Sequence, residues 1–196
     1  METLEAIRTR RTVGKSTGDI PRETIRELIE AATWAPNHKL TQPWRFTVLT
    51  GAARERLGEV WGREAAAKVD PAAQASVLAG ESKKPLRAPA LIVVSLRTDT
   101  NPVTAEEHLT ATAAAVQNLL LAAHAKGLSA AWKTGKIVYN VEVKRFLGLD
   151  PSDRIIAVVY LGAVASEEST PRTRNVDSSI TWLDEAPLAA GATSPR

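Results

Sequence analysis

Hydrophobic and polar residues follow two periods along this chain, and each period predicts one kind of element. Apolar side chains recur at three- and four-residue spacing between Pro21 and Pro36, which predicts an amphipathic helix bounded by the two prolines. Related but weaker patterns predict helices at 4–10, 52–68, 71–84 and 140–148. Alternating or continuous apolar runs of strand length predict strands at 44–50, 89–95, 129–134 and 154–161.

The most apolar helix pattern lies in the middle of the chain. Thr104 and Glu107 have the spacing of a capping box, and Gly127 provides a stop, so the pattern predicts a helix over 105–126. Its apolar side chains lie on almost every face of that helix. A helix without a continuous polar face is expected to be buried. We therefore expect this helix to be the central one of the domain.

Strands that are separated by helices predict a three-layer domain of α and β elements. The chain has 196 residues, enough for one core, and neither an internal repeat nor a long linker divides it. We therefore expect a single domain over 1–196. From about 165 to 196 the sequence becomes rich in Ser, Thr, Pro and Arg, which predicts an extended tail.

Composition removes several classes of function. The chain has no cysteine, which excludes disulfides, thiolate metal sites and cysteine nucleophiles, and its three histidines show no metal-ligand spacing. No apolar run is long enough for a membrane span, and the N-terminus does not resemble a secretory signal, so we expect a cytoplasmic protein. The 25 basic residues are dispersed among 22 acidic ones, which argues against nucleic-acid binding.

Neither a G-x-G-x-x-G fingerprint nor a P-loop follows a predicted strand, so any bound phosphate needs another kind of clamp. The first candidate is the segment 8–12, Arg-Thr-Arg-Arg-Thr, because one guanidinium group can donate two parallel hydrogen bonds to the oxygens of an anion. The alternative is that arginines at a helix C-terminus complement the helix dipole and stay solvated.

Two further segments concentrate polar groups. The stretch 36–44, Pro-Asn-His-Lys-Leu-Thr-Gln-Pro-Trp, is a stiff loop directly before a strand, which favours a binding site. Its alternative role is to cap the preceding helix. The stretch 130–135, Ala-Ala-Trp-Lys-Thr-Gly, has small residues that admit a planar ring and a lysine that can balance negative charge. Its alternative is a strand edge followed by a turn.

Together these segments resemble the FMN-dependent nitroreductase family, most closely its compact branch of small NAD(P)H nitroreductases. The resemblance runs from about Leu4 to Gly162. Its carriers are Arg-Arg-Thr at 10–12, Ala-Ala-Thr-Trp-Ala-Pro-Asn-His-Lys at 31–39, Gln-Pro-Trp-Arg-Phe at 42–46 and Trp-Lys-Thr-Gly at 132–135. It implies an α+β class with a three-layer α/β/α fold, in which a mixed, mainly antiparallel sheet surrounds the buried helix of a homodimer.

The resemblance also implies a cofactor site. Arg10, Arg11 and Thr12 would hold the FMN phosphate and ribityl chain. His38 and Trp34 would reach the flavin from the partner subunit, with Gln42 in the same cofactor-binding set. Trp132, Lys133 and Thr134 would lie along the flavin, with Lys133 stabilising negative charge on the ring. In the tail, Arg172 and Arg174 would be further phosphate ligands, and residues from about 165 to 196 would wrap the partner subunit.

The expected activity follows from this cofactor. FMN would carry hydride from NADH or NADPH to nitroaromatic, quinone-like or related electron-poor small molecules in ping-pong order, so the chain needs no metal and no nucleophile of its own. An alternative with the same binding residues is a flavin storage or regulatory protein without reductase turnover. Both readings predict a homodimer that binds neither nucleic acid nor membrane.

Overall fold

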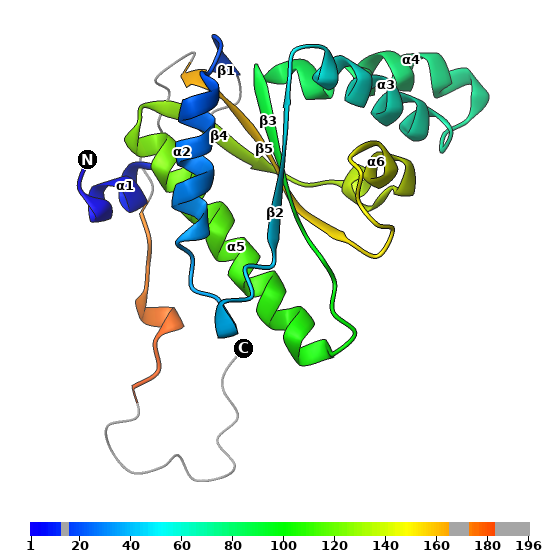
Figure 1. Cartoon of the computed structure of the whole chain (residues 1–196). Coiled ribbons are helices and arrows are strands. Elements are labelled where there is room, and N and C mark those ends of the chain that lie inside the picture. The colour runs from blue at the N-terminus through cyan, green and yellow to red at the C-terminus, as the bar shows by residue number, and fades with distance from the viewer. Residues whose placement is uncertain (13–15, 165–172, 183–196) are drawn as a thin grey trace.

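The computed structural model describes residues 1–12, 16–164 and 173–182 (Figure 1). Its middle layer is a five-stranded sheet with the path β1-β5-β3-β2, and β4 pairs with β5. The strands are β1 (Ser16–Thr17), β2 (Trp44–Thr50), β3 (Ala90–Leu96), β4 (Leu128–Lys133) and β5 (Arg154–Val164). All pairings among these strands are antiparallel. The two-residue strand β1 is not among the strands that the sequence pattern predicts.

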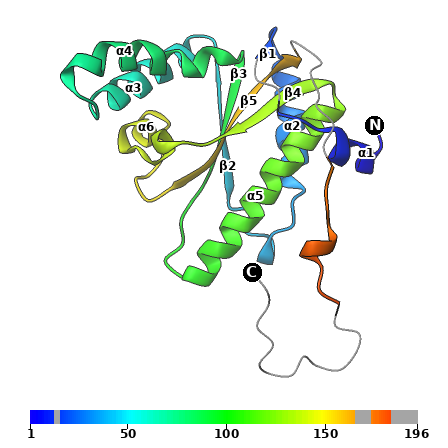
Figure 2. The same ribbon diagram turned by 180° about the vertical axis from the view of Figure 1, so that it is seen from behind.

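Helices cover both faces of the sheet. They are α1 (Thr3–Thr9), α2 (Arg22–Thr33), α3 (Ala52–Ala66), α4 (Pro71–Ser82), α5 (Pro102–Ala125) and α6 (Val141–Phe146). Short 3-10 turns are η1 (His38–Leu40), η2 (Lys84–Arg87), η3 (Lys136–Tyr139) and η4 (Asp177–Ser179). The views from front and back show α2 and α5 on one face and α3, α4 and α6 on the other (Figures 1 and 2). The predicted three-layer α+β fold is confirmed.

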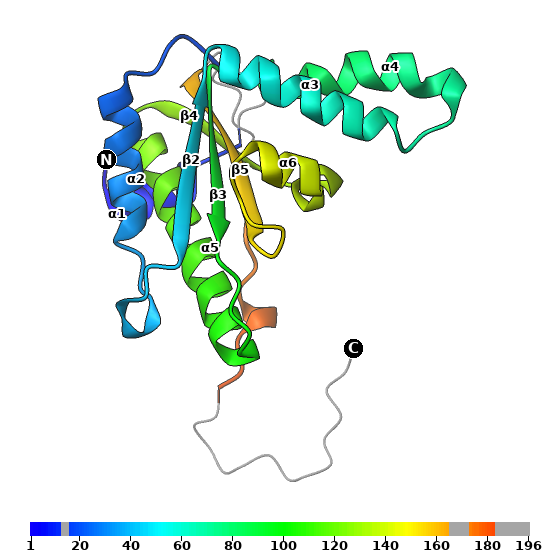
Figure 3. The same cartoon turned by 45° about the vertical axis from the view of Figure 1, so that its right-hand side comes forward.

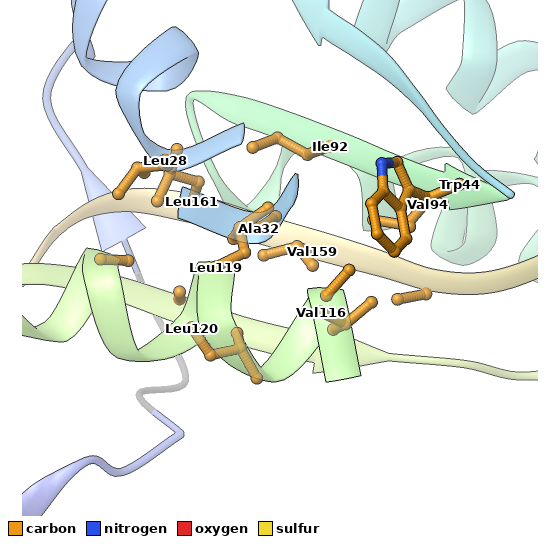
Figure 4. Close-up of a cluster of buried hydrophobic side chains, with 14 of the residues drawn as sticks. Leu28, Ala32, Trp44, Ile92, Val94, Val116, Leu119, Leu120, Val159 and Leu161 are labelled. Atoms are coloured by element: carbon orange, nitrogen blue, oxygen red, sulfur yellow. The ribbon is translucent and has the colours of Figure 1, made fainter. Parts of the chain in front are cut away.

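Alternation along the central strands produces two separate cores. On β3, Ile92 and Val94 face α2 and α5, whereas Leu91 and Val93 face α3 and η3. The first core is shown in Figure 4, where Val116, Leu119 and Leu120 of α5 meet the sheet. Because β3 is covered on both faces, all of its residues are buried, as its continuous apolar sequence predicts.

A β-bulge interrupts the pairing of β3 with β5. The register passes from Val94 opposite Ala157 to Ser95 opposite Ile155, so Ile156 is the extra residue. A bulged residue leaves the regular ladder and its carbonyl needs another donor. The indole Nε1–H of Trp132 donates to the Ile156 carbonyl oxygen over 3.0 Å. Trp132 thereby joins β4 to the bulge and packs against the core beside α5.

The central helix α5 is buried as predicted, but the prediction of its start is wrong. It begins at Pro102, and Asn101 is the N-cap. The Asn101 Oδ1 accepts hydrogen bonds from the backbone N–H of Val103 at 2.9 Å and of Thr104 at 3.3 Å. Asn is a strong N-cap residue and Pro is favoured at the first helical position, so this pair determines the start rather than the capping box.

The C-terminal region is described only over 173–182, where every residue is exposed. The predicted tail wrapping over 165–196 falls largely outside the described residues. No helix among the described residues is long and apolar enough to cross a membrane.

Candidate functional site

A cavity of about 710 Å³ lies beside the end of β4, between the sheet and the α3–α4 hairpin. Its first wall comes from α3 and the turn after it, where Trp61, Ala65 and Lys68 follow each other at helical spacing. Its second wall comes from α4 and η2 at Val77, Glu81 and Lys84. The sheet closes the remaining side. Figure 3 shows the hairpin extending outward from the upper end of β2 and β3.

Close packing of α3 and α4 builds the helical walls. A Cβ atom on Gly58 would collide with the backbone oxygen of Ser82, and one on Gly62 would collide with the Ser82 side chain. The two glycines are four residues apart and so lie on one face of α3. Only residues without a side chain permit this approach of the two helices, and the sequence pattern alone did not reveal that role.

The sheet side of the cavity contains two of the predicted site residues, Lys133 and Thr134. Ala131 pairs with Tyr160, and both side chains project into the core on the α3 side, as Lys133 does by strand alternation. Trp132 therefore points to the opposite face, where it contacts the bulge and the α5 core. The structure thus places Lys133 and Thr134 on the cavity and separates Trp132 from them.

The floor of the cavity is apolar and its rim is cationic. Burial is the main reason that the pKa of Tyr160 is raised to about 12; nearby Glu81 raises it and Arg87 lowers it. The Tyr160 hydroxyl is therefore protonated and able to donate at neutral pH. Glu81 is bound to Lys84, with 2.5 Å between Oε1 and Nζ. An apolar floor with cations around it suits a flat ring that carries or gains negative charge.

The predicted phosphate clamp, Arg10 to Thr12, directly follows α1. Ser16, a few residues further along the chain, lines the cavity, and its hydroxyl donates to Ser129 Oγ on β4 over 3.3 Å. The charges of Arg10 and Arg11 act on His124 in the last turn of α5, which places the clamp near the end of that helix. Nη1 of Arg11 also donates to the carbonyl oxygens of Arg8 and Arg10, at 2.6 and 2.9 Å. Arg11 therefore also makes the helix-end contact that the alternative reading predicts.

His124 connects α1 to the end of α5. Thr9 Oγ1 donates to the Glu5 carbonyl oxygen at 2.7 Å and lies 2.8 Å from His124 Nε2. Because the hydroxyl has only one hydrogen, the ring must donate in the second contact. Burial, followed by the charges of Arg10 and Arg11, lowers the pKa of His124. Both effects disfavour a charged imidazole at this helix end.

The predicted loop from Pro36 to Pro43 lies at the other edge of the sheet, before the edge strand β2. Lys39, Leu40 and Gln42 have φ values of 53°, 53° and 46°, in the left-handed region that these residues rarely adopt. Asn37 Oδ1 holds the turn together by accepting from the Gln42 N–H at 2.9 Å. Backbone strain of this kind concentrates at binding sites, which favours the functional interpretation of the loop.

Within one chain, this loop does not reach the cavity. Trp34 at its start is 79% exposed, and His38 and Gln42 are absent from the cavity lining. Trp44 at its end is a core residue, 7% exposed, and does not line the cavity. Of the tail candidates, Arg174 is exposed and does not line the cavity, and Arg172 lies outside the described residues.

Sequence reasoning missed Trp61, Glu81, Lys84, Arg87 and Tyr160, all of which line the cavity. The available signal was the four- and three-residue spacing of Val77, Glu81 and Lys84, which places them on one face. Over residues 1–12, 16–164 and 173–182, no group of three or more His, Asp or Glu side chains could hold a metal ion.

The model of the Nitroreductase family matches residues 7–163, most of the chain. The chain belongs to this family. The Bacillus subtilis protein "Putative NAD(P)H nitroreductase YfhC" is 31% identical over 160 residues, which are 81% of this chain and 82% of that protein. Thus the family resemblance inferred from the separate sequence motifs is confirmed.

Solved structures show the same fold. A nitroreductase-like family protein of Bacillus cereus superposes with a TM-score of 0.85 at 26% identity, over 94% of this chain and 97% of that one. A Desulfovibrio desulfuricans protein crystallised in complex with FMN has a TM-score of 0.66 at 30% identity, over 95% of this chain and 98% of that one. The α3–α4 and β4 elements that form the cavity are therefore part of a fold shared with these nitroreductase-like proteins.

Proposed function

We propose that this chain is a homodimeric FMN-dependent oxidoreductase that uses NADH or NADPH to reduce nitroaromatic, quinone-like or related electron-poor small molecules. The observation that carries the proposal is the cavity beside Lys133 and Thr134, with its apolar floor and cationic rim. Its support from relatives is the FMN complex of the Desulfovibrio protein and the name of the Bacillus subtilis one. We expect the enzyme to work in the cytoplasm.

The cavity suits FMN in size and chemistry. About 710 Å³ lies within the range of small-molecule sites, and Trp61, Ala131 and Ile137 provide an apolar surface for a planar ring. Arg10 and Arg11 lie close enough to His124, in the last turn of α5, for their charges to lower its pKa, and α5 leads into β4 and Lys133. A ligand with a flat ring at one end and a phosphate at the other matches this order of groups.

When bound, FMN would supply the hydride chemistry, taking hydride from NAD(P)H and passing it to the acceptor in alternate half-reactions. The residues of this chain would bind and orient it. Arg10, Arg11 and Thr12 would hold the phosphate by charge-assisted hydrogen bonds. Lys133 and Lys84 would stabilise negative charge at the ring edge, while the neutral Tyr160 hydroxyl adds a donor in the floor.

A second copy of the chain would complete the site. The loop from Asn37 to Gln42 has a strained backbone but lies at the sheet edge opposite β4. Its exposed Trp34 and Leu40, each 79% accessible, are typical of residues that a partner covers. In this arrangement His38, Trp34 and Gln42 would enter the partner's flavin site. The exposed Arg174 and the unassigned Arg172 would belong to a tail that wraps the partner.

The absorbance spectrum of the purified protein tests the proposal. Flavin bands, present at once or after addition of FMN and desalting, are expected, together with the mass of a dimer in solution by light scattering. A protein that stays colourless after incubation with FMN contradicts the proposal.

Anaerobic addition of NADH or NADPH separates the enzyme from the alternative, a flavin store or regulator without turnover. Bleaching of the flavin bands, followed by their return when a quinone is added, is expected for the reductase. Persistent flavin absorbance with both nucleotides would instead support the storage protein.

A further inference from the structure

The charge of the cavity differs from that of the whole chain. Five cationic residues line it: Lys68, Lys84, Arg87, Lys133 and Lys136. The lining contains one carboxylate, Glu81, which is already bound to Lys84. Over the whole sequence 25 basic residues face 22 acidic ones. The cavity is thus a local concentration of positive charge, and a low-dielectric wall focuses such a field on a ligand.

These cations lie at two ends of the cavity. Lys133 projects from the end of β4, and Lys84 and Arg87 belong to η2, where the hairpin returns to the sheet. Lys68 follows the end of α3 and precedes α4, so it lies in the hairpin turn, the part of the hairpin farthest from the sheet (Figures 1 and 3). If two ligands bind end to end in the cavity, the cations near the sheet would therefore contact one of them, and the cation in the turn would contact the other.

The hairpin end is also apolar enough for an aromatic ring. Lys68 is followed by Val69, and Val77 of α4 lies across from them on the cavity lining. Trp61 and Ala65 continue the same surface toward the sheet. An aromatic ring with an anionic substituent would contact the valines and Trp61 with its face and Lys68 with its charge. Like Lys68, the rim cation Lys136 lies outside β4 and η2; it belongs to η3.

We propose that the acceptors of this enzyme are flat, electron-poor aromatic compounds with an anionic group, and that Lys68 at the α3–α4 turn binds that group. This inference rests on the proposed function, because it assigns the sheet end of the cavity to the flavin and the hairpin end to the acceptor. For a nitro compound one two-electron turnover is R–NO₂ + NAD(P)H + H⁺ → R–NO + NAD(P)⁺ + H₂O.

The expected effect of Lys68 is modest, because its side chain is exposed. Exposed ion pairs correspond to about a two- to fivefold change in binding, and salt weakens them. Reversal of the charge removes an attraction and adds a repulsion, so Lys68→Glu is expected to act about twice as strongly, on a logarithmic scale, as Lys68→Gln.

The test compares two acceptors of similar shape, 4-nitrobenzoate and neutral 4-nitrobenzamide, with the FMN-loaded enzyme at saturating NADPH. The measured quantity is the ratio of their kcat/KM values. We expect Lys68→Glu to lower the nitrobenzoate/nitrobenzamide ratio about fivefold or more, and added KCl to lower it in the wild type more than in Lys68→Gln. The matched control is Lys83→Glu, the same charge change at an exposed hairpin residue that does not line the cavity.

Three outcomes contradict the proposal in distinguishable ways. Failure of the wild type to bind FMN, or failure of both NADH and NADPH to bleach its flavin, would overturn the proposed function itself. Normal turnover of 4-nitrobenzamide with equal ratios in Lys68→Glu and Lys83→Glu would overturn only the role of Lys68. A change in the NADPH/NADH preference of Lys68→Glu with an unchanged acceptor ratio would assign Lys68 to the nucleotide phosphate and overturn the acceptor inference.

Discussion

Two polar segments of this chain, the end of β4 and the loop from Asn37 to Gln42, both have the composition of a binding site but differ in their surroundings. Lys133 and Thr134 line a cavity that their own chain builds from α3, α4, η2 and β5. The loop lies at the opposite edge of the sheet, with a strained backbone and exposed neighbours such as Trp34. The end of β4 therefore shares a cavity with other elements of its own chain, whereas the loop does not contact that cavity.

This difference suggests that one subunit does not contain the whole candidate site. A single copy contains both the cavity and the candidate clamp, but its strained loop does not reach the cavity of the same copy. In the proposed dimer, each loop would contribute to the cavity of the other subunit, which would account for candidate binding residues at opposite sheet edges. The predictions below separate contributions made within one chain from those made between two chains.

The largest expected effect is on the phosphate clamp, which belongs to the same chain as the cavity. The double substitution Arg10→Ala and Arg11→Ala should weaken FMN binding by a factor of about 10² or more, because each lost charge-assisted hydrogen bond is worth about 1.5–3 kcal/mol. Quenching of flavin fluorescence on titration measures the affinity. The control is Arg63→Ala, on the exposed side of α3, where Arg63 contacts only Glu64 among the ion pairs found. Equal losses in both proteins would show that the clamp is elsewhere.

A mixture of two defective chains tests directly whether the loop acts between subunits. His38→Ala and the clamp variant should each bind FMN poorly as homodimers, His38→Ala about tenfold less tightly than wild type. Coexpression should restore about a quarter of all sites. About half of the dimers that form by random pairing are heterodimers, and each heterodimer keeps one intact site out of two. Flavin content per dimer, measured by absorbance after desalting, reports this recovery. Absence of recovery in confirmed heterodimers would place loop and clamp in one chain's site.

The hairpin packing that forms the cavity wall should be sensitive to a single methyl group. Gly58→Ala inserts a Cβ against the Ser82 backbone oxygen, and overpacking of this kind costs about 1–3 kcal/mol. A fall in Tm of about 5 °C is therefore expected by scanning calorimetry. Gly80→Ala is the matched control, because Gly80 lies in α4 with open space around its Cβ position. A stable Gly58→Ala protein would mean that the hairpin can shift freely.

The smallest expected effect is a dependence of stability on pH through His124. Its pKa is lowered in the folded protein, so the unfolded chain takes up a proton first as the pH falls below the ordinary value of 6.5. The contribution is fully present above that pH and is lost as the pH falls toward the lowered pKa. Urea unfolding without added FMN at pH values on either side of 6.5 should show this loss, and His124→Gln should reduce it. An identical pH profile in the variant would remove His124 as its source.

Much of the architecture was predictable because it depends on local pattern. The continuous apolar sequence of β3 predicted a strand covered on both faces, and the all-round apolar pattern of α5 predicted a buried helix. The start of α5 was mispredicted because two overlapping N-cap signals compete within one turn, and Asn101 with Pro102 is the stronger pair. The short strand β1 was missed because two residues give no readable alternation.

The candidate site was predictable only in part, because much of it depends on contacts between distant segments and not on local pattern. Lys133 and Thr134 stood out because they belong to a segment with the composition of a binding site. Trp132 belongs to the same segment, but its side chain points away from the cavity and donates a hydrogen bond to the bulged Ile156. Glu81, Lys84 and Tyr160 lie far apart in sequence, and no local pattern connects α4, η2 and β5. Trp44 ends the polar loop, and only the packed structure shows that its side chain belongs to the core.

The sequence by itself determined the layers of the fold, the polar segments and the family, because hydrophobic periodicity and short motifs are encoded locally. The absence of cysteine also led to the expectation that a redox activity here would belong to a bound cofactor. Only the tertiary structure decided which polar residues share a cavity, that the cavity is cationic, and that the strained loop lies at the opposite edge. Those properties depend on contacts between distant segments, and the strand register, the bulge and the glycine contact of α3 with α4 set these contacts only once the chain is packed.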